Sequence, residues 1–270
     1  MSDNNRPIGI FDSGIGGLTV VSEVMALLPH EDLIYFGDTA HVPYGSKSPE
    51  AVTRFSMEIA CFLQTKNSKM LVVACNTATA HALPALHKSL NMPIVGVIEP
   101  GAQCAAATTR NGRVGVIGTE GTVASGSYAK AIKSHKAAVK VFQQACPLFV
   151  PLVEEGWLDT AVTEQVARAY LAPLLKQKID ALVLGCTHYP LLKTVIGRVA
   201  GKKIVLIDSA IATAARVQNV LSERGLLRAG KAKGRCQFFV SDAPEKFRTV
   251  GRRFLGNRIA TVNKVMIEGL

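Results

Sequence analysis

The chain has 270 residues, of which 48% are hydrophobic, 19% charged and 6% aromatic. This balance supplies enough apolar side chains for a substantial core, so it excludes wholesale disorder and a collagen-like repeat. We favour two modest domains over one large one, because single cores stop growing at about 250 to 300 residues. The polar residues 1–6 and the lack of an apolar run of about 18 residues predict a cytoplasmic protein without a signal peptide or membrane span.

The formal net charge is +11, and most of the excess lies between Arg224 and Lys264. That segment holds eleven Lys and Arg side chains against two acidic ones, Asp242 and Glu245. Nucleic-acid binding is one interpretation, but the segment has neither a zinc-finger nor an RNP-type aromatic pattern. We favour a solvated basic face and expect no nucleic-acid partner. Its aromatic residues fit strand and helix cores: Phe238, Phe239, Phe247 and Phe254.

Six cysteines are spread along the chain, without a C-x-x-C pair or a Cys/His cluster at zinc-ligand spacing. We therefore expect neither a disulfide framework nor a structural metal site. In a reducing compartment, a cysteine with a functional role would act as a free thiol. The remaining cysteines would be small buried hydrophobic residues.

Short apolar, β-branched runs alternate with longer segments of helical period, which is typical of an α/β protein with mainly parallel sheets. The first segment of helical period is Leu18–Leu28, and further helices are predicted at Pro49–Lys66, Thr160–Gln177 and Ile211–Arg224. Ser48 reads as the N-cap of the second of these helices. The predicted strands are, in chain order, Ile8–Phe11, Leu33–Phe36, Met70–Ala74, Ile94–Val97, Val114–Ile117, Val139–Phe142, Ala181–Leu184, Ile204–Ile207 and Gln237–Val240.

A weak internal duplication relates the two halves of the chain. The strand and turn at Ile8–Gly14 resemble Val114–Glu120, and the run Leu71–Thr77 resembles Leu182–His188. Such a repeat changes the expected architecture, because each copy should build a similar unit.

We therefore predict two similar α/β domains related by pseudo-twofold symmetry, with the active site in the cleft between them. The first domain would comprise residues 1–98 and 207–270, and the second residues 99–206.

The duplicated runs contain Cys75 and Cys186, each at the close of a predicted strand. Ligands of open α/β sheets bind outside the carboxyl ends of the strands, so both thiols should border a site. Polar residues that can begin a helix follow each cysteine, and a helix N-terminus stabilises a thiolate. Either cysteine alone could be a packed core residue. Their matched contexts favour a shared function.

Two thiols on opposite sides of a cleft suit removal of a proton from one face of a carbon atom and delivery of a proton to the other. This is the geometry of two-base racemisation. A single Cys–His pair could instead support acyl transfer, although such a nucleophile does not need a second thiol. Cys146 also ends an apolar run, but no polar helper follows it, and we predict a structural role.

The glycine-rich turn after the first strand carries Asp12 and Ser13. It matches neither the dinucleotide-binding pattern G-x-G-x-x-G nor a P-loop, so nucleotide binding is the weaker interpretation. Asp12 would bind an ammonium group or orient a proton. The alternative for Asp12 is an Asx-turn at the start of a helix.

Three further segments offer polar groups. The segment Asp38–Ser46 has hydroxyls and few apolar anchors, and we interpret it as a substrate loop. His188 could hydrogen-bond to the Cys186 thiolate or act as an acid. Glu154 follows an apolar segment and is expected in a loop, either at the site or in an exposed acidic turn.

Taken together, these segments resemble the glutamate racemases, cofactor-independent members of the aspartate/glutamate racemase superfamily. The resemblance covers nearly the whole chain, and it is specific because the motifs occur together and in order. The matching motifs are Gly9–Gly17, Tyr35–Thr39, Pro43–Gly45, Ala74–Ala78, Gly96–Gly101, Pro151–Glu154 and Leu184–Pro190.

The resemblance implies interconversion of L-glutamate and D-glutamate for bacterial peptidoglycan, without pyridoxal phosphate or a metal. Cys75 and Cys186 would be the two proton-transfer thiols. Asp12 would assist on the Cys75 side, and His188 and Glu154 around Cys186. The implied substrate-binding residues are Asp12, Ser13, Tyr44, Gly45, Asn76, Thr77, Thr187 and His188.

Aspartate and hydantoin racemases would share the two-thiol core and are the alternative enzymes. Outside enzymes, the alternative is an inactive binding protein that uses its basic C-terminal segment. Retention of both thiols and their polar helpers argues against that alternative. The sequence leaves the choice between a monomer and a homodimer open.

Overall fold

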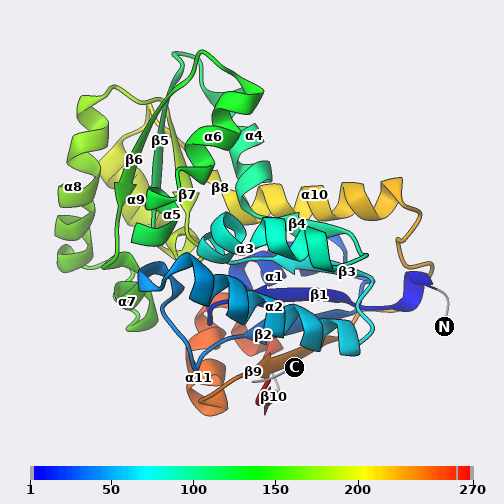
Figure 1. Cartoon of the computed structure of the whole chain (residues 1–270). Coiled ribbons are helices and arrows are strands. Elements are labelled where there is room, and N and C mark those ends of the chain that lie inside the picture. Colours follow the sequence, from blue (N-terminus) through cyan, green and yellow to red (C-terminus); the bar gives the residue numbers. More distant parts are fainter. Residues whose placement is uncertain (1–2, 260, 268–270) are drawn as a thin grey trace.

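The structure is a computed structural model that describes residues 3–259 and 261–267. Within these residues the strands form two sheets, and every strand pair is parallel (Figure 1). The first sheet contains β1 (Ile8–Asp12), β2 (Leu33–Gly37), β3 (Met70–Val73), β4 (Ile94–Gly96), β9 (Cys236–Val240) and β10 (Val262–Lys264). The second contains β5 (Arg113–Gly118), β6 (Lys140–Ala145), β7 (Ala181–Gly185) and β8 (Val205–Asp208).

The two sheets repeat one topology. The first has the order β10-β9-β2-β1-β3-β4, and the second has the order β6-β5-β7-β8. Raising each strand number by four converts β2-β1-β3-β4 into the whole second sheet, so the duplication seen in the sequence is also present in the topology. The predicted fold class, two similar α/β units with parallel sheets, is confirmed.

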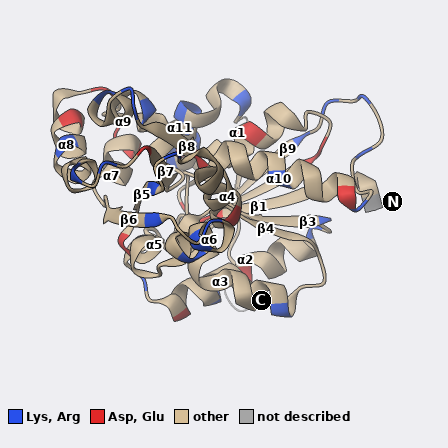
Figure 2. Cartoon of the chain, turned by 90° about the horizontal axis from the view of Figure 1, so that it is seen from above, with Lys and Arg blue, Asp and Glu red and all other residues tan. Residues whose placement is uncertain are grey.

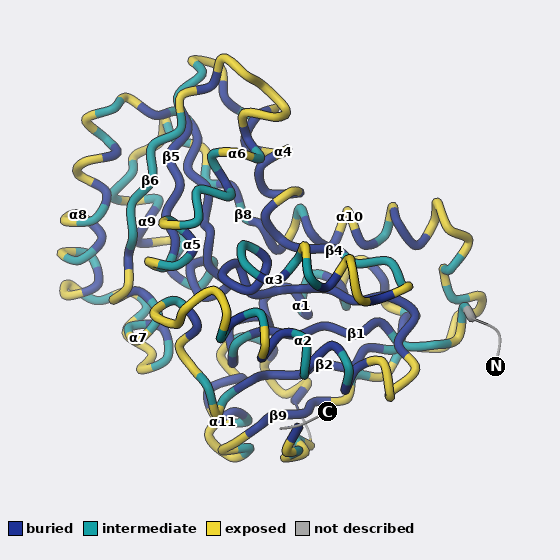
Figure 3. The backbone as a smooth tube through the Cα atoms, viewed as in Figure 1, coloured by how far each residue is buried: buried dark blue, intermediate teal, exposed yellow. Residues whose placement is uncertain are grey.

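Helices cover both faces of the first sheet, which explains why its central strands β1, β2 and β3 are buried and almost entirely apolar. One face packs against α1 (Leu18–Leu27), α10 (Ser209–Glu223) and α11 (Pro244–Leu255). The other face packs against α2 (Pro49–Thr65) and α3 (Asn76–Ser89). The strands accordingly run as a buried layer through the molecule (Figure 3).

The second sheet is covered in the same way. The helices on one face are α7 (Phe149–Glu154), α8 (Ala161–Lys176) and α9 (Lys193–Ala200). The other face carries α4 (Ile98–Thr108) and α6 (Ser127–His135). A short helix, α5 (Glu120–Ala124), follows β5, and single 3₁₀ turns occur at η1 (Asp3–Asn5), η2 (Tyr44–Ser46), η3 (Tyr189–Leu192) and η4 (Gly256–Arg258).

The predicted elements agree with the structure to within about two residues at most ends, with a few differences. Ser48 caps α2 as predicted, because its Oγ accepts a hydrogen bond from the Ala51 N–H at 3.2 Å. β10 was not predicted, since this three-residue edge strand is largely polar. Cys104 is exposed on α4, so the expectation that the other cysteines would all be buried is wrong for it. Cys61 and Cys236 are partly buried, and Cys146 is fully buried.

The basic C-terminal segment is spread over several elements and is partly neutralised by acidic neighbours (Figure 2). Arg228 pairs with Asp32 at 2.7 Å, and Lys264 pairs with Asp242 at 2.5 Å. Phe238, Phe239 and Phe247 are buried as predicted. Within the described residues, no helix is both long and apolar enough to span a membrane.

Candidate active site

A cavity of about 410 Å³ lies where the carboxyl ends of the central strands of both sheets meet. Residues that follow β1, β3, β5 and β7 line it: Ser13, Cys75, Thr119 and Cys186. A cavity of this size is typical of small-molecule sites. The two duplicated halves therefore contribute equivalent strand ends to one site.

Cys75 is the N-cap residue of α3 and is 5% exposed. Its sulfur accepts a hydrogen bond from the Ala78 N–H at 3.4 Å and donates one to Ser13 Oγ at 3.7 Å. Burial, and then the nearby charge of Asp12, raise the pKa of Cys75 to about 12, against the lowering effect of the Ala78 and Ser13 hydrogen bonds. The expected stabilisation of a thiolate by the helix N-terminus is present but is outweighed, so Cys75 is a neutral thiol near pH 7.

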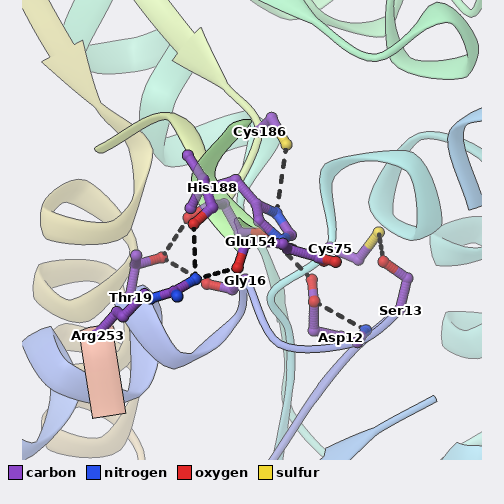
Figure 4. A network of polar contacts seen from close by, with 12 residues as sticks. Asp12, Ser13, Gly16, Thr19, Cys75, Glu154, Cys186, His188 and Arg253 are labelled. Carbon is purple, nitrogen blue, oxygen red and sulfur yellow. Dashed lines mark hydrogen bonds and ion pairs between the residues drawn. The ribbon is translucent and has the colours of Figure 1, made fainter. Parts of the chain in front are cut away.

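Cys186, His188 and Glu154 form a chain of contacts on the other side of the cavity (Figure 4). Cys186 Sγ lies 4.0 Å from His188 Nδ1, and His188 Nε2 lies 3.1 Å from Glu154 Oε1. Burial opposes the charged form of His188, but hydrogen bonds to Cys186 and Glu154 outweigh it and raise the His188 pKa to about 10. The same hydrogen bond from His188 lowers the pKa of Glu154. An imidazolium held in this position stabilises a negative charge on the Cys186 sulfur.

Asp12 is fully buried beside the cavity, and it is absent from the residues that line it. Its Oδ2 accepts from the Gly14 N–H at 3.0 Å, which is the contact of an Asx-turn, and its Oδ1 accepts from Thr187 Oγ1 at 3.4 Å. Burial raises the pKa of Asp12, while the charge of His188 and the backbone N–H groups of Gly17 and Gly14 lower it. Asp12 thus influences both sides, because it acts on Cys75 through its charge and bonds to a residue beside Cys186.

The segment after β2 is anchored by a buried carboxylate. Asp38 accepts hydrogen bonds from Tyr44 Oη at 2.6 Å and Ser241 Oγ at 2.7 Å, and it contacts His41 Nδ1 at 2.9 Å. These contacts fix η2 so that Tyr44 and Gly45 line the cavity. Asp38 therefore joins the predicted substrate loop to the end of β9.

Side chains from the two sheets meet directly at the site. Thr77 Oγ1 lies 2.9 Å from Thr119 Oγ1, and Thr19 Oγ1 donates to the Thr187 carbonyl at 3.0 Å. A Cβ atom on Gly16 would lie 2.4 Å from His188 Nδ1, so glycine is required for this close approach. The two halves of the site are therefore in contact through small and hydroxyl-bearing residues.

The structure brings ten of the eleven predicted site residues to the cavity wall, with Asp12 directly behind it. The ten are Ser13, Tyr44, Gly45, Cys75, Asn76, Thr77, Glu154, Cys186, Thr187 and His188. Glu154 ends helix α7, where the sequence had indicated a loop. Thr119 was not predicted, although the duplication aligns it with Ser13 and could have identified it. Within the described part of the chain, no group of three or more His, Cys, Asp or Glu side chains is placed to hold a metal ion.

The chain is an α/β protein in which equivalent strand ends of two similar sheets face one cavity. Comparison with known protein families shows which family has this chain as a member. The model of the family described as Asp/Glu/Hydantoin racemase matches residues 19–217. The chain belongs to this family of isomerases.

Similar curated proteins and solved structures include several glutamate racemases. A glutamate racemase from Geobacter metallireducens is 58% identical over 263 residues, covering 97% of each chain. The structure of a glutamate racemase isoform from Bacillus anthracis superposes with a TM-score of 0.94 at 42% identity, covering 97% of this chain and 98% of that one. A Francisella tularensis glutamate racemase, solved in complex with D-glutamate, has a TM-score of 0.91 at 38% identity and covers 99% of this chain and 100% of its own.

Proposed function

We propose that this protein interconverts L-glutamate and D-glutamate by moving the Cα proton between two thiols. The observation that carries the proposal is the position of Cys75 and Cys186 at equivalent strand ends of two similar sheets, both lining one cavity. The relatives named glutamate racemase support glutamate as the substrate, and the D-glutamate formed would supply peptidoglycan synthesis.

The reaction needs one thiolate and one thiol at the start of each turnover. In one direction Cys186, which contacts His188, acts as the base, and Cys75 supplies the neutral thiol. The thiolate takes the Cα proton of one enantiomer, and the electron pair of the broken C–H bond moves onto the carboxylate. The second thiol then protonates Cα from the opposite face, and the enantiomer is released with the protonation states exchanged. The other enantiomer reacts through the same steps in reverse.

The difficult step is removal of a weakly acidic Cα proton, because negative charge develops on the substrate carboxylate. Hydrogen-bond donors aimed at that carboxylate in a water-poor site lower the barrier. Ser13 and Asn76 line the cavity and offer a hydroxyl and an amide group for this role. Thr77 and Thr187 also line it, but their hydroxyls already bond to protein groups, Thr77 to Thr119 and Thr122 and Thr187 to Asp12. Asp12, buried behind them, holds Thr187 through its hydroxyl.

We also propose the two domains expected from the sequence, residues 1–98 with 207–270 and residues 99–206, with one adjustment. Because β8 pairs with β7 as far as Asp208, we propose that the second crossing lies just after Asp208. The reaction requires two reduced thiols, which supports a cytoplasmic location. Because one chain contributes both thiols to the cavity, the proposed reaction needs no second subunit, and a monomer or a homodimer could carry it out.

Proton NMR and circular dichroism on L-glutamate in D2O test the proposal, with thiols kept reduced and no pyridoxal phosphate or metal added. The proposal predicts loss of the Cα–H signal together with decay of optical activity to zero. Inertness towards glutamate combined with turnover of aspartate or a hydantoin would keep the mechanism and change the substrate. Inertness towards all three would favour a binding protein.

A further inference from the structure

Tyr128, on α6, lies between the two cysteine-bearing strand ends, although no step of the proposed reaction uses it. It is fully buried. Its Oη donates a hydrogen bond to Oδ1 of Asn76, the residue after Cys75, at 2.7 Å. Its ring packs on Gly185, the residue before Cys186, because a Cβ atom there would lie 3.0 Å from Tyr128 Cε2. One side chain therefore contacts the chain neighbours of both thiols.

The hydrogen bond from Tyr128 determines how the Asn76 amide is oriented. An amide accepts at its oxygen and donates at its nitrogen, so a donor bound to Oδ1 turns Nδ2 the other way. Asn76 lines the cavity and is 3% exposed. Among the residues that the structure describes, its Nδ2 has no hydrogen-bond partner. Nδ2 is itself buried, and a buried donor without a partner is costly, so an acceptor brought against it from the cavity would relieve that cost.

The phenol is a dependable donor in this environment. Burial raises the pKa of Tyr128 above its ordinary value, and a hydrogen bond with Ser209 only partly opposes this. Tyr128 consequently keeps its proton near neutral pH. Thr77, the next residue, differs from Asn76 because its hydroxyl already has two protein partners, Thr119 and Thr122.

We propose that Tyr128 is a positioning residue that holds the Asn76 amide with Nδ2 directed at a carboxylate of the bound amino acid. The inference rests on the proposed function, since it assigns the recognition of an amino-acid carboxylate within that site. Because Tyr128 comes from a helix on the second sheet and Asn76 from a helix on the first, the contact also makes substrate recognition depend on how the two halves are arranged.

The test is a double-mutant cycle with Tyr128→Phe and Asn76→Ala, measured as kcat and KM for L-glutamate. Tyr128→Phe keeps the ring on Gly185 and removes only the donor. We expect it to lower kcat/KM by roughly three- to tenfold, as for loss of one hydrogen bond. In the Asn76→Ala background the same change should have no further effect, because Tyr128 acts through Asn76. Ser134→Ala, which removes an exposed hydroxyl from the same helix α6, serves as the control and should leave kcat/KM unchanged.

Two outcomes would overturn the positioning role while the wild type racemises glutamate normally. One is a Tyr128→Phe variant with wild-type kinetics. The other is an equal loss of kcat/KM in both backgrounds, which would indicate a general structural effect. Thermal melting of each variant checks that the protein is folded. A wild type that does not racemise glutamate would instead contradict the proposed function, so the two failures are distinguishable.

Discussion

His188 Nε2 lies 3.1 Å from Glu154 Oε1, although the two residues are 34 positions apart: Glu154 ends α7, and His188 lies between β7 and η3. The contact orients the ring so that Nδ1 faces Cys186. It also favours the charged imidazole over the neutral one, despite burial. The charge available to Cys186 therefore depends on a carboxylate that reaches the site from α7.

The pH dependence of activity should reveal this pair. The His188 pKa is raised above its ordinary value to about 10, so the imidazolium is present below that pH and lost above it. Glu154→Gln removes one of the groups that raise the His188 pKa, and the alkaline limb of kcat/KM should move to lower pH. Profiles of kcat/KM between about pH 7 and 10.5 measure the shift. Glu155→Gln is the control, and coincident alkaline limbs for Glu154→Gln and the wild type would refute the assignment.

Replacing either proposed thiol should abolish efficient turnover. Cys75→Ser and Cys186→Ser each remove one of two acid–base groups, and each should lower kcat by roughly 10²- to 10⁴-fold. Because the equilibrium constant between enantiomers is fixed, kcat/KM must fall equally in the two directions. Cys104→Ser, at an exposed thiol on α4, should keep the wild-type rate. A near-normal rate in either active-site variant would rule out the two-thiol assignment.

Arg253 lies on α11, which packs on the first sheet, and it bonds to the end of α7, which packs on the second sheet. Its guanidinium donates to the carbonyl oxygens of Val153 and Glu154 (Figure 4). The next residue, Phe254, packs edge-on against the His188 ring with centroids 5.9 Å apart. Arg253→Ala should loosen Glu154 and reduce kcat/KM about fivefold, equivalent to about 1 kcal/mol for the lost hydrogen bonds. Steady-state kinetics measure the effect, with Arg252→Ala at the exposed neighbouring position as the control. Equal kcat/KM for the two variants would contradict the proposed role of Arg253.

A buried ion pair far from the cavity should matter for stability and leave catalysis intact. Lys69 Nζ lies 2.5 Å from Glu31 Oε2 and also donates to the carbonyls of Asn4 and Leu226. Lys69→Met leaves the Glu31 carboxylate buried without its cation, which should cost about 3 to 5 kcal/mol of unfolding free energy. Denaturant unfolding measures this loss, with exposed Lys88→Met as the control. A loss of unfolding free energy below about 1 kcal/mol would contradict the expected contribution of this ion pair to stability.

The arrangement of strands and the pair of cysteines were predictable, because both depend on local patterns that the chain repeats. Cys75 and Cys186 follow apolar runs that any parallel sheet would bury, and the duplication places them at equivalent edges. The same repeat aligns Ser13 with Thr119, a signal present in the sequence but not used.

Contacts between distant segments were not predictable. The Tyr128–Asn76 hydrogen bond spans 52 positions and the Arg253–Glu154 contact spans 99. Both depend on how helices of one unit pack beside the other, which no local pattern encodes. The protonation of Cys75 was missed for a related reason: the helix N-terminus was visible in the sequence, but the depth of burial that outweighs it arises only from tertiary packing.

Isotope incorporation at early times tests the central claim, that two thiols act on opposite faces of Cα. L-glutamate is incubated in D2O with the protein, the enantiomers are separated, and the mass of each is followed before equilibrium. The two-thiol account predicts that newly formed D-glutamate carries deuterium at Cα while unreacted L-glutamate keeps its protium, and the converse when D-glutamate is the starting material. Product that retains the original protium, or deuterium entering the unreacted enantiomer as fast as the product, would show that one base serves both faces.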